Sequence, residues 1–332
     1  MIYHNKKILI IGGTGTIGYH LTRRLLQDNP KVIRIFSRDE FKQYQMNIDF
    51  QDQQEKLRFL IGDVRDYQRI LRAMEDIDYV FHLAAMKHVP ACEYNPFEAV
   101  QTNVIGTQNV IQAAMQSGVK KVLFTSSDKA ISPTNTYGAT KLTAERLISA
   151  AEYQKGPKST VFSSVRFGNV MGSRGSVIPL FKKQILENRC VTVTDLNMVR
   201  YMMTPSQAIS LLLEANALAS GGEVFVLKMP VVKLSDLVTV MIEELCAKNN
   251  LPVHDIKINE IGLRPGEKMY EELMTEDESR IALEKAEMYI IPSLFAGKQW
   301  GSGNIVSKPM PQENSSIPQN LLRDWLLTEV LI

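Results

Sequence analysis

The chain has few cysteines and no excess of charge of either sign. Its 332 residues include only three cysteines, Cys92, Cys190 and Cys246, and no Cys-x-x-Cys pair. Disulfide frameworks, zinc sites and redox motifs need more cysteines at closer spacing, so we expect three reduced thiols and no metal site. The 38 basic and 36 acidic residues leave a net charge of +2, which argues against a nucleic-acid partner.

Long hydrophobic runs are also missing. No apolar stretch approaches the roughly 20 residues that a membrane-spanning helix needs, and the first seven residues are polar rather than a signal peptide. We therefore expect a cytoplasmic protein without a membrane partner. The hydrophobic fraction of 45% and the charged fraction of 22% are ordinary for a globular protein, and the length favours two lobes.

Short apolar strands alternate with helical patterns through the first half of the chain. This alternation predicts an α/β fold in which a doubly wound parallel sheet, the Rossmann arrangement, is covered by helices on both faces. The clearest helical pattern runs over residues 96–117. The strands are expected at Ile8–Ile11, Val32–Phe36, Leu57–Ile61, Tyr79–Ala84, Lys121–Ser126 and Val161–Phe167.

The pattern changes after about Gly168, where prolines and loops become more frequent. We expect a dinucleotide-binding domain over residues 1–168, to which later segments return. Residues 169–332 are expected to form mainly a smaller, mixed α/β substrate lobe. The polar stretch over residues 300–318 is expected to wrap the surface before a last helix at Asn320–Leu327.

A glycine-rich segment, Gly-Gly-Thr-Gly-Thr-Ile-Gly, follows the first expected strand and opens the first helix. Glycines allow a tight turn and let the backbone approach a pyrophosphate, which is stabilised at the positive end of the helix. A G-x-G-x-x-G pattern alone is weak, but a strand before it and a helix after it make dinucleotide binding the favoured interpretation. The expected cofactor contacts here are Gly12, Thr14, Gly15, Thr16, Ile17 and Gly18.

The residues at the end of the second expected strand indicate whether the dinucleotide is NAD or NADP. NAD enzymes usually place a carboxylate there, whereas NADP enzymes place arginine or small hydrogen-bond donors. Ser37 and Arg38 occupy this position and Lys42 follows one helical turn later, which favours NADP over NAD. Solvated residues at a helix start are the alternative interpretation. Further cofactor contacts are expected at the ends of the following strands, from Asp63 and Val64 near the adenine, and from Ala84, Ala85 and Ser126.

Tyr137 and Lys141 are four residues apart, after the fifth strand. On a helix they would share one face. A phenol is a poor base at neutral pH, but a nearby ammonium group stabilises its phenolate. Such a pair can take a hydroxyl proton while the nicotinamide takes a hydride from the same carbon. A pair with this spacing is common by chance, but downstream of a dinucleotide loop it predicts redox catalysis.

Several motifs together resemble the UDP-N-acetylglucosamine 4,6-dehydratases, a branch of the extended short-chain dehydrogenases. The resemblance covers residues 7–278 and rests on GGTGTIG (12–18), AAMKHVP (84–90), SSDKAISPTNTYGATK (126–141), RFGNVMGSRGSVIP (166–179) and GLRPGEK (262–268). The specific part is the Asp128-Lys129 pair. Related epimerases and reductases usually carry small residues there, and dehydratases of dTDP-glucose carry Asp-Glu.

The resemblance implies a redox-neutral reaction on a UDP-linked amino sugar. After C4 is oxidised, the C5 hydrogen becomes acidic, and loss of water needs a base at C5 and an acid at the C6 hydroxyl. Lys129 would be the base and Asp128 the acid, beside Tyr137 and Lys141. The resemblance further implies four substrate contacts, whose arginines suit phosphate oxygens. These contacts are Asn169, Arg200, Arg264 and Glu267. A fifth contact, to sugar or phosphate, is expected from Lys87 because it lies in the loop after the fourth strand.

The stereochemistry at C5 is left open by conflicting motifs. Soluble members of the family often invert C5 and keep the tyrosine, as this chain does at Tyr137. The segments 192–204 and 266–278 look more like the branch that retains configuration, and we expect retention, with inversion as the alternative. A UDP-sugar 4-epimerase or ketoreductase, and a non-catalytic NADP-binding protein, are further alternatives. A homo-oligomer is expected because the helices over 96–117 and 137–153 commonly pair between subunits in this fold.

Overall fold

The computed structural model describes residues 2–264, 266–293, 306 and 315–332. The chain forms two compact units, each assembled from three segments. The first unit contains residues 1–167, 209–227 and 274–308, and the second contains residues 168–208, 228–273 and 309–332. Most of the expected surface stretch over residues 300–318 lies outside the described residues. No helix within the described ranges is long and apolar enough to cross a membrane.

A nine-stranded sheet forms the centre of the first unit's described part, in the order β13-β14-β10-β6-β5-β4-β1-β2-β3. The run from β3 to β10 is parallel, and β14 and β13 add antiparallel at the β10 edge. The strands are β1 (Lys7–Ile11), β2 (Val32–Ser37), β3 (Leu57–Ile61), β4 (Tyr79–His82), β5 (Lys121–Thr125), β6 (Val161–Arg166), β10 (Val224–Leu227), β13 (Leu283–Glu284) and β14 (Met288–Ile291).

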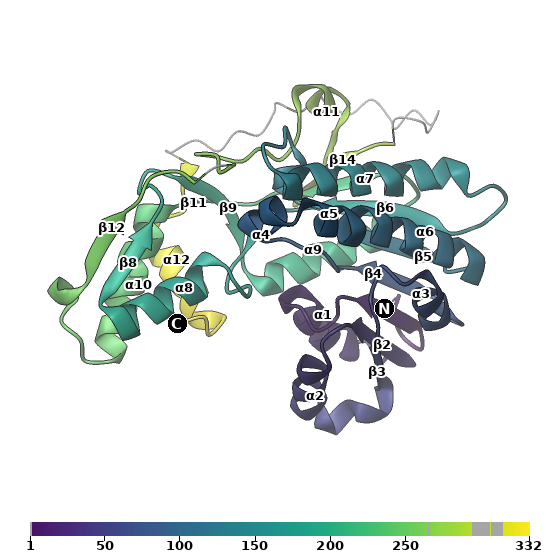
Figure 1. Ribbon diagram of the computed structural model, residues 1–332, viewed down its shortest axis with the longest axis horizontal. Helices are drawn as coiled ribbons and strands as arrows, with labels where there is room; N and C mark the ends of the chain where they lie inside the picture. Colours follow the sequence, from purple (N-terminus) through teal and green to yellow (C-terminus); the bar gives the residue numbers. More distant parts are fainter. Residues whose placement is uncertain (1, 265, 294–305, 307–314) are drawn as a thin grey trace. The chain divides into compact units, whose positions relative to one another are not determined.

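Helices cover this sheet, as the expected doubly wound fold requires. On one face, a core cluster joins alternate residues of β1, such as Leu9 and Ile11, to helices α3, α6 and α7. Figure 1 shows α5, α6 and α7 lying along the strands β4 to β6. The helices of this unit are α1 (Thr16–Leu26), α2 (Glu40–Asp49), α3 (Tyr67–Met74), α4 (Val89–Tyr94), α5 (Pro96–Val100), α6 (Gly106–Ser117), α7 (Thr136–Gln154) and α11 (Glu276–Ile281). Helix α9 (Pro205–Leu218) belongs to this unit from Ile209 onward.

The second unit has two small sheets and its own hydrophobic core. Strands β7 (Asn169–Val170), β9 (Val199–Met203) and β11 (Val231–Lys233) form one sheet, and β8 (Cys190–Val193) pairs with β12 (Lys257–Glu260) in the other. Helices α8 (Val177–Lys183), α10 (Leu234–Lys248) and α12 (Gln319–Thr328) pack around a core that includes Phe181, Leu237 and Leu326. In Figure 1 these helices lie beside β8 and β12.

The structure corrects some of the expected elements. The single helix expected over residues 96–117 is divided into α5, a π-helical turn over Gln101–Ile105 and α6. Strand β4 ends at His82 and not at Ala84, because the chain turns away into the loop that precedes α4. Strand β10 is no such departure, because later segments were expected to return to the first domain and β10 pairs with β6 in the large sheet.

Candidate functional site

The turn between β1 and α1 is shaped by its glycines. Gly12 has φ +84°, a left-handed conformation, and its amide donates to the carbonyl of Phe36 at 2.8 Å. A Cβ atom at Gly12 would lie 2.7 Å from the Ala84 nitrogen, and one at Gly18 would lie 2.4 Å from the Gly13 oxygen. The glycines therefore let the turn pack directly against the backbone of the loop after β4, and let the start of α1 pack against the backbone of the turn.

The first turn of α1 is open to an anion. Its N-cap is Gly15, which offers no side-chain hydrogen bond, and no acidic residue stands in the first turn. The backbone amides and the helix dipole at such an end favour a phosphate group. The glycine turn and this helix end thus fit a dinucleotide, and they bring together the residues expected around it, namely Gly12, Thr14, Gly15, Thr16, Ile17 and Gly18.

Ser37, Arg38 and Lys42 were expected to lie near the 2′ position of the cofactor's ribose. Ser37 is buried at the end of β2, where Gln43 donates hydrogen bonds to its Oγ at 2.9 Å and its carbonyl at 3.1 Å. The Arg38 side chain is 61% exposed and lies 3.9 Å from Asp63. Lys42 pairs with Asp39, the N-cap of α2, at 2.6 Å. Arg38 is therefore the more accessible of the two cations.

Asp63 and Val64 follow β3, as expected for residues near an adenine. Arg65 donates to both Asp63 carboxylate oxygens, with distances of 2.7–3.0 Å. Burial tends to raise the Asp63 pKa, but the Arg65 hydrogen bonds outweigh it and the pKa lies below its usual value. Val64 is buried against Gly106 of α6. Asp63 is thus held as a carboxylate by Arg65, which the sequence interpretation did not anticipate.

Asp128 and Lys129 lie in a single helical turn directly after β5. Asp128 is fully buried, and its Oδ1 accepts from Lys129 Nζ at 3.0 Å and from Ser127 Oγ at 2.9 Å. Its Oδ2 is buried without a hydrogen-bond partner among the described residues. An unsatisfied buried carboxylate oxygen is costly. Asp128 Oδ2 therefore has the capacity to accept a hydrogen bond that the described residues do not supply.

Tyr137 stands in the first turn of α7, close to the Asp128-Lys129 turn. Asn135 caps the helix by accepting from the Gly138 amide at 2.9 Å. Burial raises the pKa of the Tyr137 phenol, while a hydrogen bond with Ser127 and the charge of Lys129 act in the opposite direction. Ser127 thus contacts both Tyr137 and Asp128, and it joins the expected redox residue to the expected acid.

Lys141 lies one helical turn beyond Tyr137 and is buried. Its Nζ donates to the Thr125 carbonyl at 2.5 Å and lies 4.1 Å from the centre of the Phe124 ring. Desolvation lowers the Lys141 pKa to about 7, although the charge of Glu145 acts to raise it. The amine is therefore close to its point of deprotonation at neutral pH. Next to Thr125, Ser126 Oγ is buried and has no partner in the described part of the chain.

The loop after β4 is fixed by Asn103, a residue that sequence reasoning missed. Asn103 is buried in the π-helical turn, where its amide exchanges two hydrogen bonds with the Met86 backbone, at 2.8 and 3.0 Å. It also donates to Thr140 of α7 at 3.0 Å. Asn103 therefore ties the loop that carries Ala84, Ala85 and the exposed Lys87 to the helix that carries Tyr137. A π-turn of this kind is often functional, but the sequence carries no clear signal of one.

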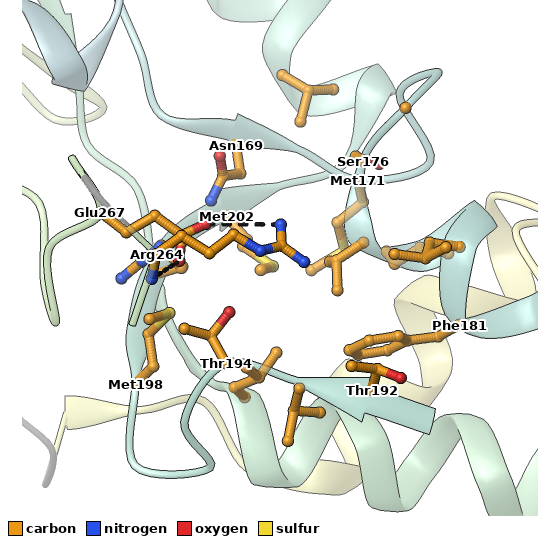
Figure 2. A pocket seen from close by; sticks show the side chains of 18 residues that line it. Asn169, Met171, Ser176, Phe181, Thr192, Thr194, Met198, Met202, Arg264 and Glu267 are labelled. Carbon is orange, nitrogen blue, oxygen red and sulfur yellow. Dashed lines mark hydrogen bonds and ion pairs between the residues drawn. The ribbon is translucent and has the colours of Figure 1, made fainter. Parts of the chain in front are cut away.

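A pocket of about 240 Å³ lies entirely within the second unit. Four of the five expected substrate contacts line it, namely Asn169, Arg200, Arg264 and Glu267. Figure 2 shows Asn169, Arg264 and Glu267 at one side of the pocket and Phe181 and Met171 at the other. Typical ligand pockets have volumes of about 300–1,000 Å³, so this one has room for part of a nucleotide sugar.

Hydrogen bonds and an ion pair within the chain hold the charged residues at one side of the pocket in place. Glu267 accepts from the Arg264 backbone amide at 3.3 Å and lies 3.8 Å from its guanidinium, as the dashed lines in Figure 2 indicate. Arg200 donates to the carbonyls of Lys268 and Met269, each at 2.8 Å. Arg200 therefore fixes the segment that carries Glu267. Half of the Arg264 side chain remains exposed, and it is the more accessible of the two guanidinium groups.

The expected residues thus fall into two groups, each within one unit. The first unit holds the glycine turn, Ser37, Arg38, Asp63, Ser126, the Asp128-Lys129 turn and the Tyr137-Lys141 helix. The second holds the pocket. Within the described ranges, no group of three or more histidine, cysteine, aspartate or glutamate side chains is arranged to hold a metal ion.

The chain is similar to several known proteins. A crystal structure of Pen from Bacillus thuringiensis is 56% identical and covers 100% of both chains, with a TM-score of 0.94. The UDP-N-acetylglucosamine 4,6-dehydratase (inverting) of Campylobacter jejuni is 43% identical over 88% of this chain and 85% of its own. A protein of Methanocaldococcus jannaschii, named an uncharacterized membrane protein, is 50% identical over 87% of this chain and 86% of its own.

Other relatives carry a different name. Several Rickettsia proteins named UDP-glucose 4-epimerase are 41–42% identical over 88% of this chain. More distant solved structures, such as a dTDP-glucose 4,6-dehydratase of Streptomyces venezuelae at 18% identity and a TM-score of 0.71, share the short-chain dehydrogenase fold. The family described as polysaccharide biosynthesis protein matches residues 8–293. The chain therefore belongs to this family of extended short-chain dehydrogenases, which includes nucleotide-sugar 4,6-dehydratases and epimerases.

Proposed function

We propose that the protein is a UDP-N-acetylglucosamine 4,6-dehydratase that inverts the configuration at C5. The observation that carries this proposal is the buried Asp128 carboxylate, bonded to Lys129 through Oδ1 and unsatisfied at Oδ2. Simple oxidation or epimerisation at C4 needs Tyr137, Lys141 and a nicotinamide, but it needs no second acid–base pair. An elimination does need one, and Ser127 joins this pair to Tyr137.

The residues divide the reaction between them. A bound nicotinamide cofactor supplies a hydride acceptor for C4 and then a hydride donor for C6. Tyr137, its phenolate stabilised by the Lys141 ammonium, takes the proton of the C4 hydroxyl. Lys129 takes the acidified C5 proton, and Asp128 protonates the C6 hydroxyl, which leaves as water. Return of a proton to the opposite face of C5 inverts that centre and gives a 4-keto-6-deoxy sugar.

The hydrogen bond between Lys129 and Asp128 suits these roles. Elimination requires a neutral amine as base and a protonated carboxyl group as acid. Movement of one proton from Lys129 Nζ to Asp128 Oδ1, across a 3.0 Å contact, produces both at once.

Inversion replaces the retention expected from segments 192–204 and 266–278. The curated dehydratases at 43% identity, from two strains of Campylobacter jejuni, are both named as inverting. The presence of Tyr137 supports the same choice. The motifs that suggested retention lie mainly in the second unit, where residues such as Thr192 and Glu267 line the pocket.

We assign substrate recognition to the second unit and cofactor binding to the first. Arg264 and Arg200 would bind the diphosphate and uridine, Glu267 the ribose, and Asn169 the sugar. In the first unit, Lys87 is a further assigned sugar or phosphate contact. NADP is the proposed cofactor because the Arg38 side chain is accessible beside Ser37 at the end of β2. A UDP-sugar 4-epimerase is the second candidate, supported by the Rickettsia relatives.

The test is to incubate the enzyme with UDP-N-acetylglucosamine in D₂O and to follow the sugar by proton NMR. The proposal expects a new C6 methyl signal, deuterium at C5 and the inverted C5 configuration, without added cofactor recycling. A product with retained C5 configuration would contradict the proposed inversion and leave the dehydratase assignment in place. Formation of the C4 epimer without solvent deuterium would support the epimerase. Accumulation of free NADPH would contradict both the dehydratase and the epimerase, because each returns its hydride to the sugar.

A further inference from the structure

The first unit contains a buried ion cluster that the proposed reaction does not use. Arg166, at the end of β6, is fully buried and donates to both Glu145 oxygens, at 3.2 and 2.6 Å. It also donates to both Glu278 oxygens, at 3.0 and 3.1 Å. Glu145 is fully buried and Glu278 nearly so. One guanidinium group thus serves two carboxylates in a region from which water is excluded.

The cluster carries more negative than positive charge. Arg146 partly offsets Glu278 at 3.5 Å, but the Arg146 side chain is 48% exposed and its charge is screened by solvent. Arg166 is shared, so the Glu145 carboxylate is left without a full positive charge of its own. Buried charges of this kind are costly unless they are paired. Another buried cation nearby would stabilise the cluster.

Lys141 is that cation. Glu145 lies four residues after Lys141 on α7, so the two side chains share the buried face of the helix. With Lys141 protonated, the buried groups comprise two positive and two negative charges. The other groups around the amine are the Thr125 carbonyl, the Phe124 ring, the neutral His82 and, one turn earlier, Tyr137.

We propose that Glu145 is a positioning residue for the redox step, which acts through Lys141 by keeping a substantial fraction of its amine protonated at neutral pH. This inference rests on the proposed roles of Tyr137 and Lys141. Desolvation lowers the Lys141 pKa to about 7, and the charge of Glu145 is what opposes it. Removal of that charge would leave a neutral amine at physiological pH. The Tyr137 phenolate would then lose the ammonium that stabilises it.

The experiment compares Glu145→Gln with Glu278→Gln. Each removes one carboxylate from Arg166, but only Glu145 is a helical neighbour of Lys141. The Lys141 pKa is measured by NMR of protein labelled at lysine Cε, with the signal assigned by its loss in Lys141→Met. An opposite charge nearby changes a pKa by about one to three units. We expect a decrease of about one unit in Glu145→Gln and little change in Glu278→Gln.

The pH profile of single-turnover C4 oxidation provides the functional readout. Its alkaline limb should move to lower pH by the same amount in Glu145→Gln only, with a roughly tenfold slower oxidation at pH 8. Equal shifts in both variants, or none in either, would overturn the proposal. If Glu145→Gln does not fold, the triple variant Glu145→Gln, Arg166→Met and Glu278→Gln removes the whole cluster. It takes away two negative charges and one positive charge, so a smaller decrease in the Lys141 pKa is expected, and no decrease would overturn the proposal. The NMR titration needs no substrate, so an enzyme with another substrate would still give this result.

Discussion

The proposed chemistry depends on a few side chains whose neighbours give them unusual properties. Asp128 has one satisfied and one unsatisfied oxygen, and Lys129 contacts the satisfied one while 21% of its side chain remains exposed. Lys141 is buried against a carbonyl and an aromatic ring. Because these roles are separate, single substitutions should separate the steps of the reaction.

Replacement of Lys129 by alanine should block elimination and spare oxidation. Loss of a general base typically lowers a rate by about 10²- to 10⁴-fold. We therefore expect little product and little deuterium at C5 in D₂O, while reduced nicotinamide still forms on mixing with substrate. The matched control is Lys120→Ala, which removes a lysine that pairs with Asp78 at the surface. Deuterium incorporation at the wild-type rate in Lys129→Ala would exclude Lys129 as the base.

Replacement of Arg38 by aspartate should weaken NADP binding far more than NAD binding. The new carboxylate would stand where the 2′-phosphate is proposed to lie, and it would also repel Asp63. Loss of one charge-assisted contact is worth about 1.5–3 kcal/mol, or roughly 10- to 100-fold in affinity for NADP. Titration of both cofactors measures this difference, with the exposed Lys31→Asp as the control for the same change in charge. Equal losses for the two cofactors would contradict the assignment.

At the scale of elements, the turn from β1 to α1 depends on close backbone approach. Gly12 combines a left-handed φ of +84° with contact to the Ala84 backbone, whereas Gly156, at φ +60°, has open space around the position of a Cβ atom. The pair separates two effects of adding a methyl group. One is backbone strain, and the other is collision with a neighbouring element.

We expect Gly12→Ala to destabilise the protein much more than Gly156→Ala. Both replacements impose a left-handed conformation on alanine, which costs about 1–2 kcal/mol. Only Gly12→Ala also forces β1 and the loop after β4 apart, so its urea midpoint should fall further and its cofactor affinity should fall as well. Similar midpoints for the two variants would show that the turn relaxes without cost.

Much of the element order could be predicted from the sequence. Apolar strands such as Leu57–Ile61 have the predicted bounds because their pattern is local. The contacts of Asn103 with Met86 and Thr140 and the pairing of β10 with β6 could not be predicted, because they join residues far apart in sequence. The contact of Gln43 with Ser37 spans only six residues, but no sequence pattern marks it. The motifs predicted Asn169 and Arg264 as substrate contacts, whereas the pocket that they line together with Phe181 could be found only from the fold.

At the scale of the whole molecule, stability should depend on His82 in mild acid. His82 is buried and its Nε2 contacts Thr107 at 3.0 Å. Desolvation lowers the His82 pKa to about 3, so the ring is neutral in the folded state. The unfolded chain binds a proton near pH 6.5, and the folded chain does so only near pH 3. Stability from this group is therefore fully present above pH 6.5 and is lost as the pH falls toward 3.

The measurement is the urea midpoint between pH 4.5 and 7.5. We expect the wild-type midpoint to fall with acid more steeply than that of His82→Gln, by up to a few kcal/mol in unfolding free energy across this range. The His254 side chain is 85% exposed, so His254→Gln should follow the wild type. Parallel curves for the wild type and both variants would show that His82 is not the source of the acid sensitivity.

The interleaving of the two units also constrains synthesis on the ribosome. The chain leaves the first unit after Phe167, returns to it at Ile209 and again at Met274. When residues 1–167 have emerged, β6 is in place, but its outer edge waits for β10, which is made about 60 residues later. An unpaired strand edge invites association with other chains. A nascent chain that stalls near residue 167 would therefore expose the unpaired edge of β6 to other chains until translation resumes. Since each unit is built from three separate segments, neither is encoded by one continuous stretch of the gene.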